Sequence, residues 1–267
     1  MFAKTGNPAL SAFEQRSMGV DASGQVVRKT MTMQGTIVAS GTLLAICVGA
    51  ALFFWGSVVT PAINAGNLGS VTPWLFGSMI VGLVLSLVCI FAKKTCPFVG
   101  PVYAACEGVF VSAVSAVIPA WFMSNGDGPP DYTIIFQAVT ITFGIFAGML
   151  IAYGAGIVKA TGVMAKMFAA GMIGVSLYFV VMLVGNLFLG SVIPNLWAST
   201  SPLGIGFSLL LVALASFSLV MDFELIKRGV NNGAPKYMEW YGAVGLLISL
   251  VWLYVEVLRL LAKLRRD

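Results

Sequence analysis

The chain contains no histidine and few charged residues of either sign. Of its 267 residues, 9% are charged, whereas a soluble domain carries about 25% charged residues. So few charges cannot cover a water-facing surface. The missing histidine removes the commonest metal ligand, the usual general base and the usual proton switch near neutral pH. Any pH sensing must therefore come from carboxyl groups.

The signatures of enzymes, metal centres and nucleic-acid sites are missing as well. The four cysteines form no C-x-x-C pair, which supports neither a zinc site nor a disulfide framework. There is no G-x-S-x-G elbow and no phosphate-cradling loop. The basic residues behind the formal charge of +5 form short clusters rather than one patch. We therefore expect no enzymatic activity, no bound cofactor and no nucleic-acid partner.

Apolar residues make up 59% of the chain and occur in seven blocks. A helix needs about 20 residues to cross about 30 Å of hydrocarbon, and each block has about this length. The blocks cover roughly residues 36–59, 74–92, 99–123, 133–157, 165–190, 203–226 and 238–263. The sequence therefore predicts an all-α membrane protein. A polar arm over residues 1–34 precedes a seven-transmembrane-helix bundle over residues 35–267 in a lipid bilayer.

Lysine and arginine residues fall in alternate connectors between the blocks. They occur in the N-terminal arm, at Lys93-Lys94, at Lys159 with Lys166, and at Lys227-Arg228 with Lys236. The positive-inside tendency then predicts a cytoplasmic N-terminus. A full seventh span would put the C-terminus outside, where Lys263, Arg265 and Arg266 oppose this tendency. Either the last block does not cross fully, or the earlier connectors decide the orientation.

Small residues recur inside the blocks. Gly144 and Gly148 are four residues apart, and Gly171 lies close to Gly174. Lipid tails give no hydrophobic drive for helix association, so close approach at small residues must supply the packing. We therefore expect these glycines to lie at helix contacts.

Four charged residues lie at membrane depth, away from the ends of the apolar blocks or matched to no obvious connector: Glu107, Asp222, Glu256 and Arg259. Each costs about 2.5–3.5 kcal/mol on insertion scales and needs a partner or a wet cavity. Glu107 either lines an ion path or is a neutral, hydrogen-bonded packing residue. Glu256 and Arg259 are three residues apart, so they can meet on one helix face. Asp222 could simply occupy a helix end, beside an i,i+4 pair of Glu224 and Arg228.

The chain resembles the Bax inhibitor-1 family, also called transmembrane Bax inhibitor motif proteins, and in particular its larger bacterial branch. The resemblance covers about residues 32–267. It depends on the order and spacing of Tyr103-Ala104-Ala105-Cys106-Glu107-Gly108, Met221-Asp222-Phe223-Glu224, Gly233-Ala234-Pro235-Lys236 with Glu239-Trp240, and Val251-Trp252-Leu253-Tyr254-Val255-Glu256-Val257-Leu258-Arg259.

This resemblance implies a bundle with the last helix at its centre and a passive, pH-sensitive calcium leak, in this case across a bacterial inner membrane. In the family, two acids on the sixth and seventh helices share a proton, and these positions match Asp222 and Glu256. Lys93 or Lys94 matches a basic residue near the pair, and Arg259 is a third candidate partner by its spacing. Calcium would be the transported ion rather than a cofactor.

Two alternatives remain open at this point. On a straight hairpin of the last two helices, Glu239 would lie nearer to Asp222 than Glu256 does, so Glu239 is a competing partner. The chain could instead act as a membrane scaffold that modulates a membrane protease or a stress-response protein without transporting ions.

Overall fold

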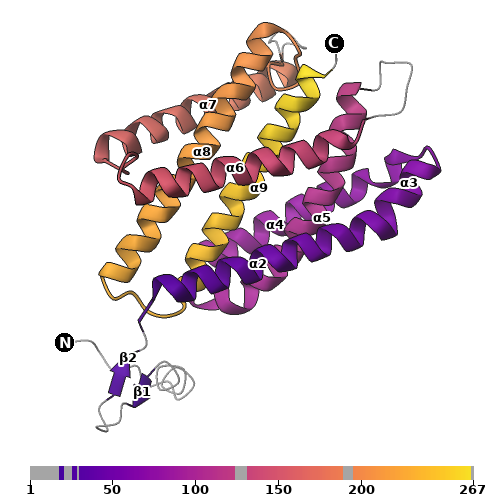
Figure 1. The fold of residues 1–267 in the computed structure, drawn as a ribbon. Coiled ribbons are helices and arrows are strands. Elements are labelled where there is room, and N and C mark those ends of the chain that lie inside the picture. Colours follow the sequence, from indigo (N-terminus) through magenta and orange to yellow (C-terminus); the bar gives the residue numbers. More distant parts are fainter. Residues whose placement is uncertain (1–17, 21–25, 29, 124–130, 189–194, 266–267) are drawn as a thin grey trace.

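The computed structural model describes residues 18–20, 26–28, 30–123, 131–188 and 195–265. Within them, seven helical segments are long and apolar enough to cross a membrane, which confirms the predicted all-α, seven-span architecture. These segments are α2 (Met33–Phe54) continued by η1 (Trp55–Val59) and α3 (Thr60–Asn64), η2 (Leu68–Ser70) with α4 (Thr72–Phe91), η3 (Lys93–Thr95) with α5 (Cys96–Met123), α6 (Thr133–Gly154), α7 (Gly162–Phe188), α8 (Pro202–Asn231) and α9 (Met238–Leu264) (Figure 1).

Most of the predicted N-terminal arm, residues 1–34, lies outside the described residues. Its described part contains a short antiparallel pair of strands, β1 (Met18–Val20) and β2 (Val26–Arg28). The end of the arm is attached to the bundle, because the backbone N–H of Met31 donates to the carbonyl of Ala234 at 2.7 Å. The start of α2 is thereby tied to the connector between α8 and α9.

The first span is longer than its apolar block because Pro61 does not end the helix. Residues Trp55–Val59 form a π-helical turn, and α3 continues from Thr60 to Asn64. Proline removes one helical hydrogen bond and crowds the preceding turn. A wider π-helical turn just before it changes the hydrogen-bond register and leaves room for the ring. The helix therefore continues through the predicted break.

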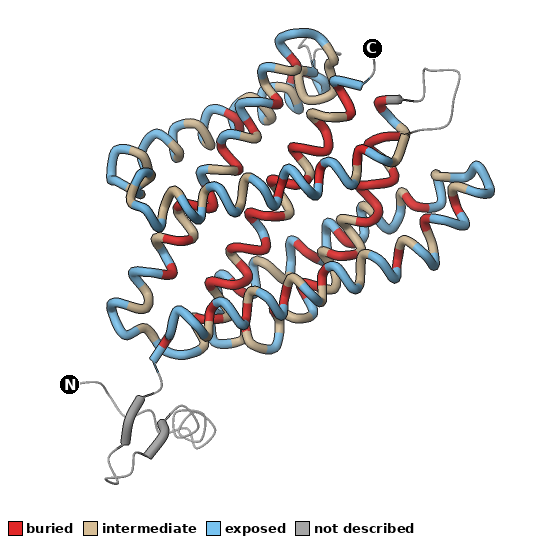
Figure 2. The backbone as a smooth tube through the Cα atoms, viewed as in Figure 1, coloured by how far each residue is buried: buried red, intermediate tan, exposed pale blue. Residues whose placement is uncertain are grey.

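Helix α9 occupies the centre of the bundle, as the family resemblance implies. It packs against α2, α4, α5, α6 and α8. In its apolar window 61% of the residues are buried, against 6% in the window of α7, which packs on α8 at the edge (Figures 1 and 2). We call the end of the bundle where α2 and α9 begin the basic end. The end where α9 finishes is the far end.

The glycines divide into tightly packed and open positions. An added Cβ at Gly171 would lie 2.8 Å from the Leu214 side chain, so this glycine is at a helix contact as expected. At Gly144, Gly148 and Gly174, no other described atom outside the local backbone lies within 4 Å of such a Cβ. The packing prediction is therefore wrong for these three within the chain, because they lie on exposed helix faces at the outside of the bundle.

Gly108 offers a direct test of this packing. A Cβ there would press on the backbone of α2, at the Cys47 carbonyl and 2.9 Å from the Ala51 nitrogen. Since helix backbone cannot move aside as a side chain can, we expect Gly108→Ala to destabilise the protein by about 1–3 kcal/mol. Gly144→Ala, where space is open, should change stability by less than about 1 kcal/mol. Unfolding in detergent, followed by circular dichroism, measures both; equal stabilities would contradict the close contact between α2 and α5.

Candidate functional site in the polar face of the central helix

Four polar side chains lie on one side of α9. Ser249, Glu256, Arg259 and Lys263 fall within about 80° of one another around the helix, at about 100° per residue. All four are buried, with exposed fractions of 6%, 5%, 0% and 1%. We call these four residues the polar face. Its length from Ser249 to Lys263 is about 21 Å by the helical rise, roughly two-thirds of the hydrocarbon thickness.

The polar face meets the antiparallel helix α8 in a fixed register. Near the middle of the bundle, the Ser249 hydroxyl donates to Oδ2 of Asp222 at 2.5 Å. At the far end, the Lys263 ammonium donates to the Ser208 hydroxyl at 2.8 Å. The two contacts are separated by the same number of residues on α8 as on α9, so the register of the two helices is constant between them.

This register gives the two predicted acids different partners. Asp222 faces Ser249, whereas Glu256 lies about two helical turns, ~10 Å, further along α9. The predicted proton-sharing contact between Asp222 and Glu256 is therefore not formed in this structure. The competing acid, Glu239, is about 15 Å from Ser249 in the opposite direction along α9. Asp222 thus lies between the two candidates and contacts neither of them.

Glu256 pairs instead with Arg259, as their spacing predicts. The guanidinium forms an ion pair with the Glu256 carboxylate. It also lies over the ring of Trp197 at 4.9 Å from the ring centre. The Arg259 Nε has no hydrogen-bond partner among the described residues. This cation is therefore held by the buried carboxylate of Glu256 and the half-buried ring of Trp197.

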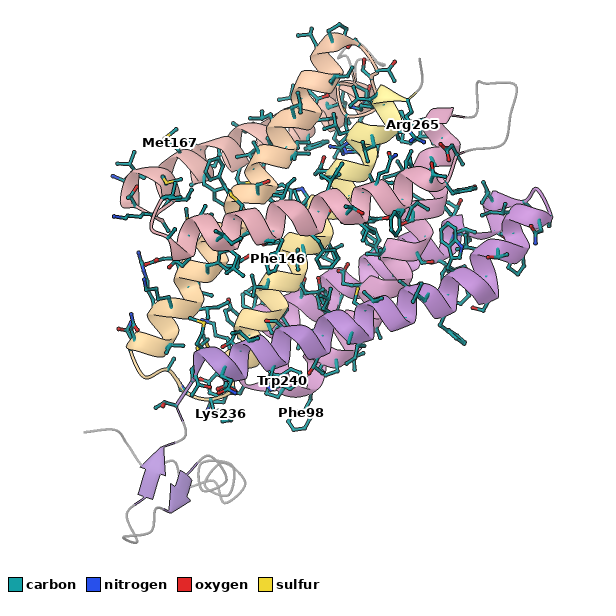
Figure 3. All side chains as sticks on the ribbon, viewed as in Figure 1. Phe98, Phe146, Met167, Lys236, Trp240 and Arg265 are labelled. Atoms are coloured by element: carbon teal, nitrogen blue, oxygen red, sulfur yellow. The ribbon has the colours of Figure 1, made fainter. Side chains whose placement is uncertain are left out.

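Glu239 has a different local role at the basic end. Its Oε1 accepts from the backbone N–H of Thr32 at 3.0 Å and from the Thr32 hydroxyl at 2.9 Å. Its Oε2 lies 3.5 Å from the Lys236 ammonium. Figure 3 labels Lys236 and the adjacent Trp240 at this end. Glu239 therefore anchors the start of α2 to the start of α9.

The predicted basic partners Lys93 and Lys94 lie in η3, also at the basic end. The Lys93 ammonium is 5.2 Å from the centre of the Tyr241 ring, an arrangement typical of a cation–π contact. Lys93 therefore contacts the start of α9 rather than Asp222, which is bonded to Ser249 further along α9, and Lys94 is exposed.

Glu107 lies in another part of the interior. Its Oε1 would be 3.2 Å from a Cβ added at Gly82 of α4, and it is close to Cys47 of α2. Its Oε2 is buried and has no hydrogen-bond partner among the described residues. Glu107 therefore belongs to the contact of α2, α4 and α5 rather than to the polar face.

Sequence reasoning did not assign Ser249 and Lys263 to the site. In the sequence, Lys263 stands out only as a cation that opposes the positive-inside tendency, yet it lies seven residues after Glu256 and four after Arg259, which puts it on the same helix face. Counting this helical spacing from Glu256 would have found it. Ser249 carried no comparable signal, because its importance depends on Asp222 of another helix.

Arg265, the other described C-terminal cation, is also engaged at the far end, where Figure 3 labels it. It forms an ion pair with Asp131 and donates to the Thr133 hydroxyl at 3.0 Å. Hydrogen bonds from Thr133, together with Arg265, lower the pKa of Asp131. The Asp131 carboxylate therefore remains charged until the pH falls below the usual value for aspartate, about 3.9. Arg266 lies outside the described residues.

The fold and the site together define a polytopic α-helical membrane protein whose central helix carries buried charges. Residues 7–266, nearly the whole chain, match the family model described as Bax inhibitor 1 like. The chain therefore belongs to this family, and the resemblance drawn from its motifs is confirmed. No curated protein and no solved structure gave a match.

Proposed function

We propose that this protein forms a pH-sensitive calcium leak pathway between α8 and α9. The observation that carries the proposal is the polar face, which places a serine and three ionisable groups in the buried centre of a membrane bundle. Each ionisable group costs about 2.5–3.5 kcal/mol on insertion scales, and such residues usually mark ion or proton paths. Helix packing alone would not require them.

Oxygen atoms along this face suit a hard divalent cation. Calcium prefers carboxylate, hydroxyl and carbonyl oxygens, and Asp222 with Ser249 provides such atoms near the middle of the bundle. Glu256 would provide a second position about 10 Å further along α9. An ion could therefore pass between two carboxylates instead of crossing a continuous apolar layer.

Protonation of these carboxyl groups supplies the pH dependence of the proposed pathway. A neutral carboxyl group attracts a divalent cation less than a carboxylate does, so low pH closes the pathway and higher pH favours flux. A single shared proton would require α8 to slide by about 10 Å along α9. We therefore propose that Asp222 and Glu256 act as two separate carboxylate positions, and that both must be ionised for flux.

The distribution of basic residues supports an orientation for this pathway. Lys93, Lys94, Lys227, Arg228 and Lys236 lie at the basic end, while Lys263 and Arg265 at the far end have internal partners. By the positive-inside tendency we propose a cytoplasmic basic end and N-terminus in the bacterial inner membrane. We propose no enzymatic activity for this protein.

Calcium flux into sealed liposomes tests the proposal. The purified protein is reconstituted into liposomes that enclose a calcium-sensitive dye. Flux is followed from about pH 5 to about pH 8, a range in which carboxyl groups with raised pKa values change their charge. We expect flux above that of protein-free liposomes, increasing with pH. Addition of a calcium ionophore at the end verifies that the vesicles were sealed. Flux equal to that of empty liposomes at every pH would exclude the leak and favour the scaffold function.

A further inference from the structure

The ammonium group of Lys263 points into the protein, although it lies at the end of a membrane helix. The residue is 1% exposed, and Nζ donates to the carbonyl of Leu196 at 3.0 Å, the carbonyl of Gly204 at 3.0 Å and the hydroxyl of Ser208 at 2.8 Å. An ammonium has three donors, and all three are used. A lysine that only anchored a helix end would extend to the interface water.

The acceptors of Lys263 lie on both sides of the start of α8. Leu196 belongs to the segment that precedes α8, which we call the far-end segment, residues 195–201. Gly204 and Ser208 belong to the first two turns of α8. Lys263 thus attaches both the far-end segment and α8 to the last turn of α9.

Arg259 holds the same segment one turn earlier on α9. Its guanidinium lies over Trp197, which is part of the far-end segment. Among the described residues, Glu256 is the one carboxylate paired with Arg259, and the acceptors of Lys263 are two carbonyls and a hydroxyl, all uncharged. Two cations and one carboxylate therefore lie where the polar face reaches the far end, and a calcium ion leaving the polar face would meet this excess of positive charge.

We propose that Lys263 closes the far end of the calcium pathway. Its ammonium fastens the far-end segment across the polar face and repels divalent cations, so flux requires Lys263 to release its acceptors. This inference rests on the proposed leak function. It adds a closing residue about 21 Å from Ser249, separate from the carboxyl groups that respond to pH.

Two substitutions separate the parts of this role. Lys263→Met removes both the charge and the hydrogen bonds, and Lys263→Gln removes the charge but keeps a donor. The control is Lys166→Met, the same chemical change at an exposed lysine near the start of α7. We expect Lys263→Met to increase calcium flux at fixed pH at least about tenfold, the factor expected for loss of a charged hydrogen bond. Lys263→Gln should give a smaller increase, and Lys166→Met should stay within about twofold of the parent.

A second measurement does not depend on flux. Ala198→Cys introduces a thiol in the far-end segment. Cys47, Cys89 and Cys96 are buried, and the half-buried Cys106 is replaced by alanine in every variant. We expect an impermeant thiol reagent to label Ala198→Cys faster when Lys263→Met is also present. Unchanged labelling would overturn the inference, whatever the flux. Faster labelling with unchanged flux would overturn the closure of the pathway. Faster labelling without calcium flux in any variant, including the parent, would support the attachment of the segment and overturn the leak function.

Discussion

Asp222→Asn is expected to hold calcium flux at the low level that the parent shows at acidic pH, at every pH tested. Asparagine has nearly the same shape as aspartate and can accept the Ser249 hydrogen bond, but it cannot ionise. In the proposed mechanism a neutral side chain at this position keeps the pathway closed. The parent should change by up to about tenfold per pH unit for each proton released. The measurement is flux into dye-loaded liposomes across the same pH range.

Glu256→Gln should give the same flat profile, because both carboxyl groups must be ionised. Glu224→Gln is the matched control: Glu224 is two residues from Asp222 on α8, but it accepts from Tyr153 at 2.6 Å and pairs with Arg228 at 2.7 Å, away from the polar face. Its profile should follow that of the parent. A parent-like pH dependence in both Asp222→Asn and Glu256→Gln would show that these acids do not gate the flux.

Arg259→Met is expected to cause a large loss of stability. The side chains of Arg259 and Glu256 are 1% and 7% exposed, so removal of the guanidinium leaves a buried carboxylate without its cation. Breaking a buried pair in this way costs about 3–5 kcal/mol. Unfolding of the purified protein in detergent, followed by circular dichroism, gives the change in free energy.

A double variant separates the contribution of the ion pair to stability from that of side-chain packing. The double variant Arg259→Met with Glu256→Leu leaves no unpaired charge and should recover all but about 1 kcal/mol of the loss. In the exposed pair, where the Arg228 side chain is 67% exposed, Arg228→Met should cost less than about 1 kcal/mol. If Arg259→Met and Arg228→Met were equally stable, the buried ion pair would have no structural importance.

The positions of the seven spans could be predicted because the thickness of the hydrocarbon layer sets the length of each apolar block. A helix needs about 20 mostly apolar residues wherever it crosses the bilayer, so each span can be recognised from its own stretch of sequence. Pairs within one helix are local in the same way. Glu256 with Arg259, and Glu224 with Arg228, follow from helical spacing alone. The tertiary structure changed the ends of the first span but not the number of spans.

Contacts between helices could not be read in this way. The sequence placed Asp222 near either Glu256 or Glu239, and the structure places it opposite Ser249. The outcome depends on how the connector between α8 and α9 turns and on how both helices pack, and a shift of a few residues exchanges every partner. The inward orientation of Lys263 could not be predicted for the same reason, because its acceptors belong to α8 and to the segment before it.

The sequence by itself determined the membrane class, the seven spans and the charges within α9, since these depend on residues close together in the chain. Only the tertiary structure decided which charge meets which partner, since that depends on the relative register of helices distant in sequence.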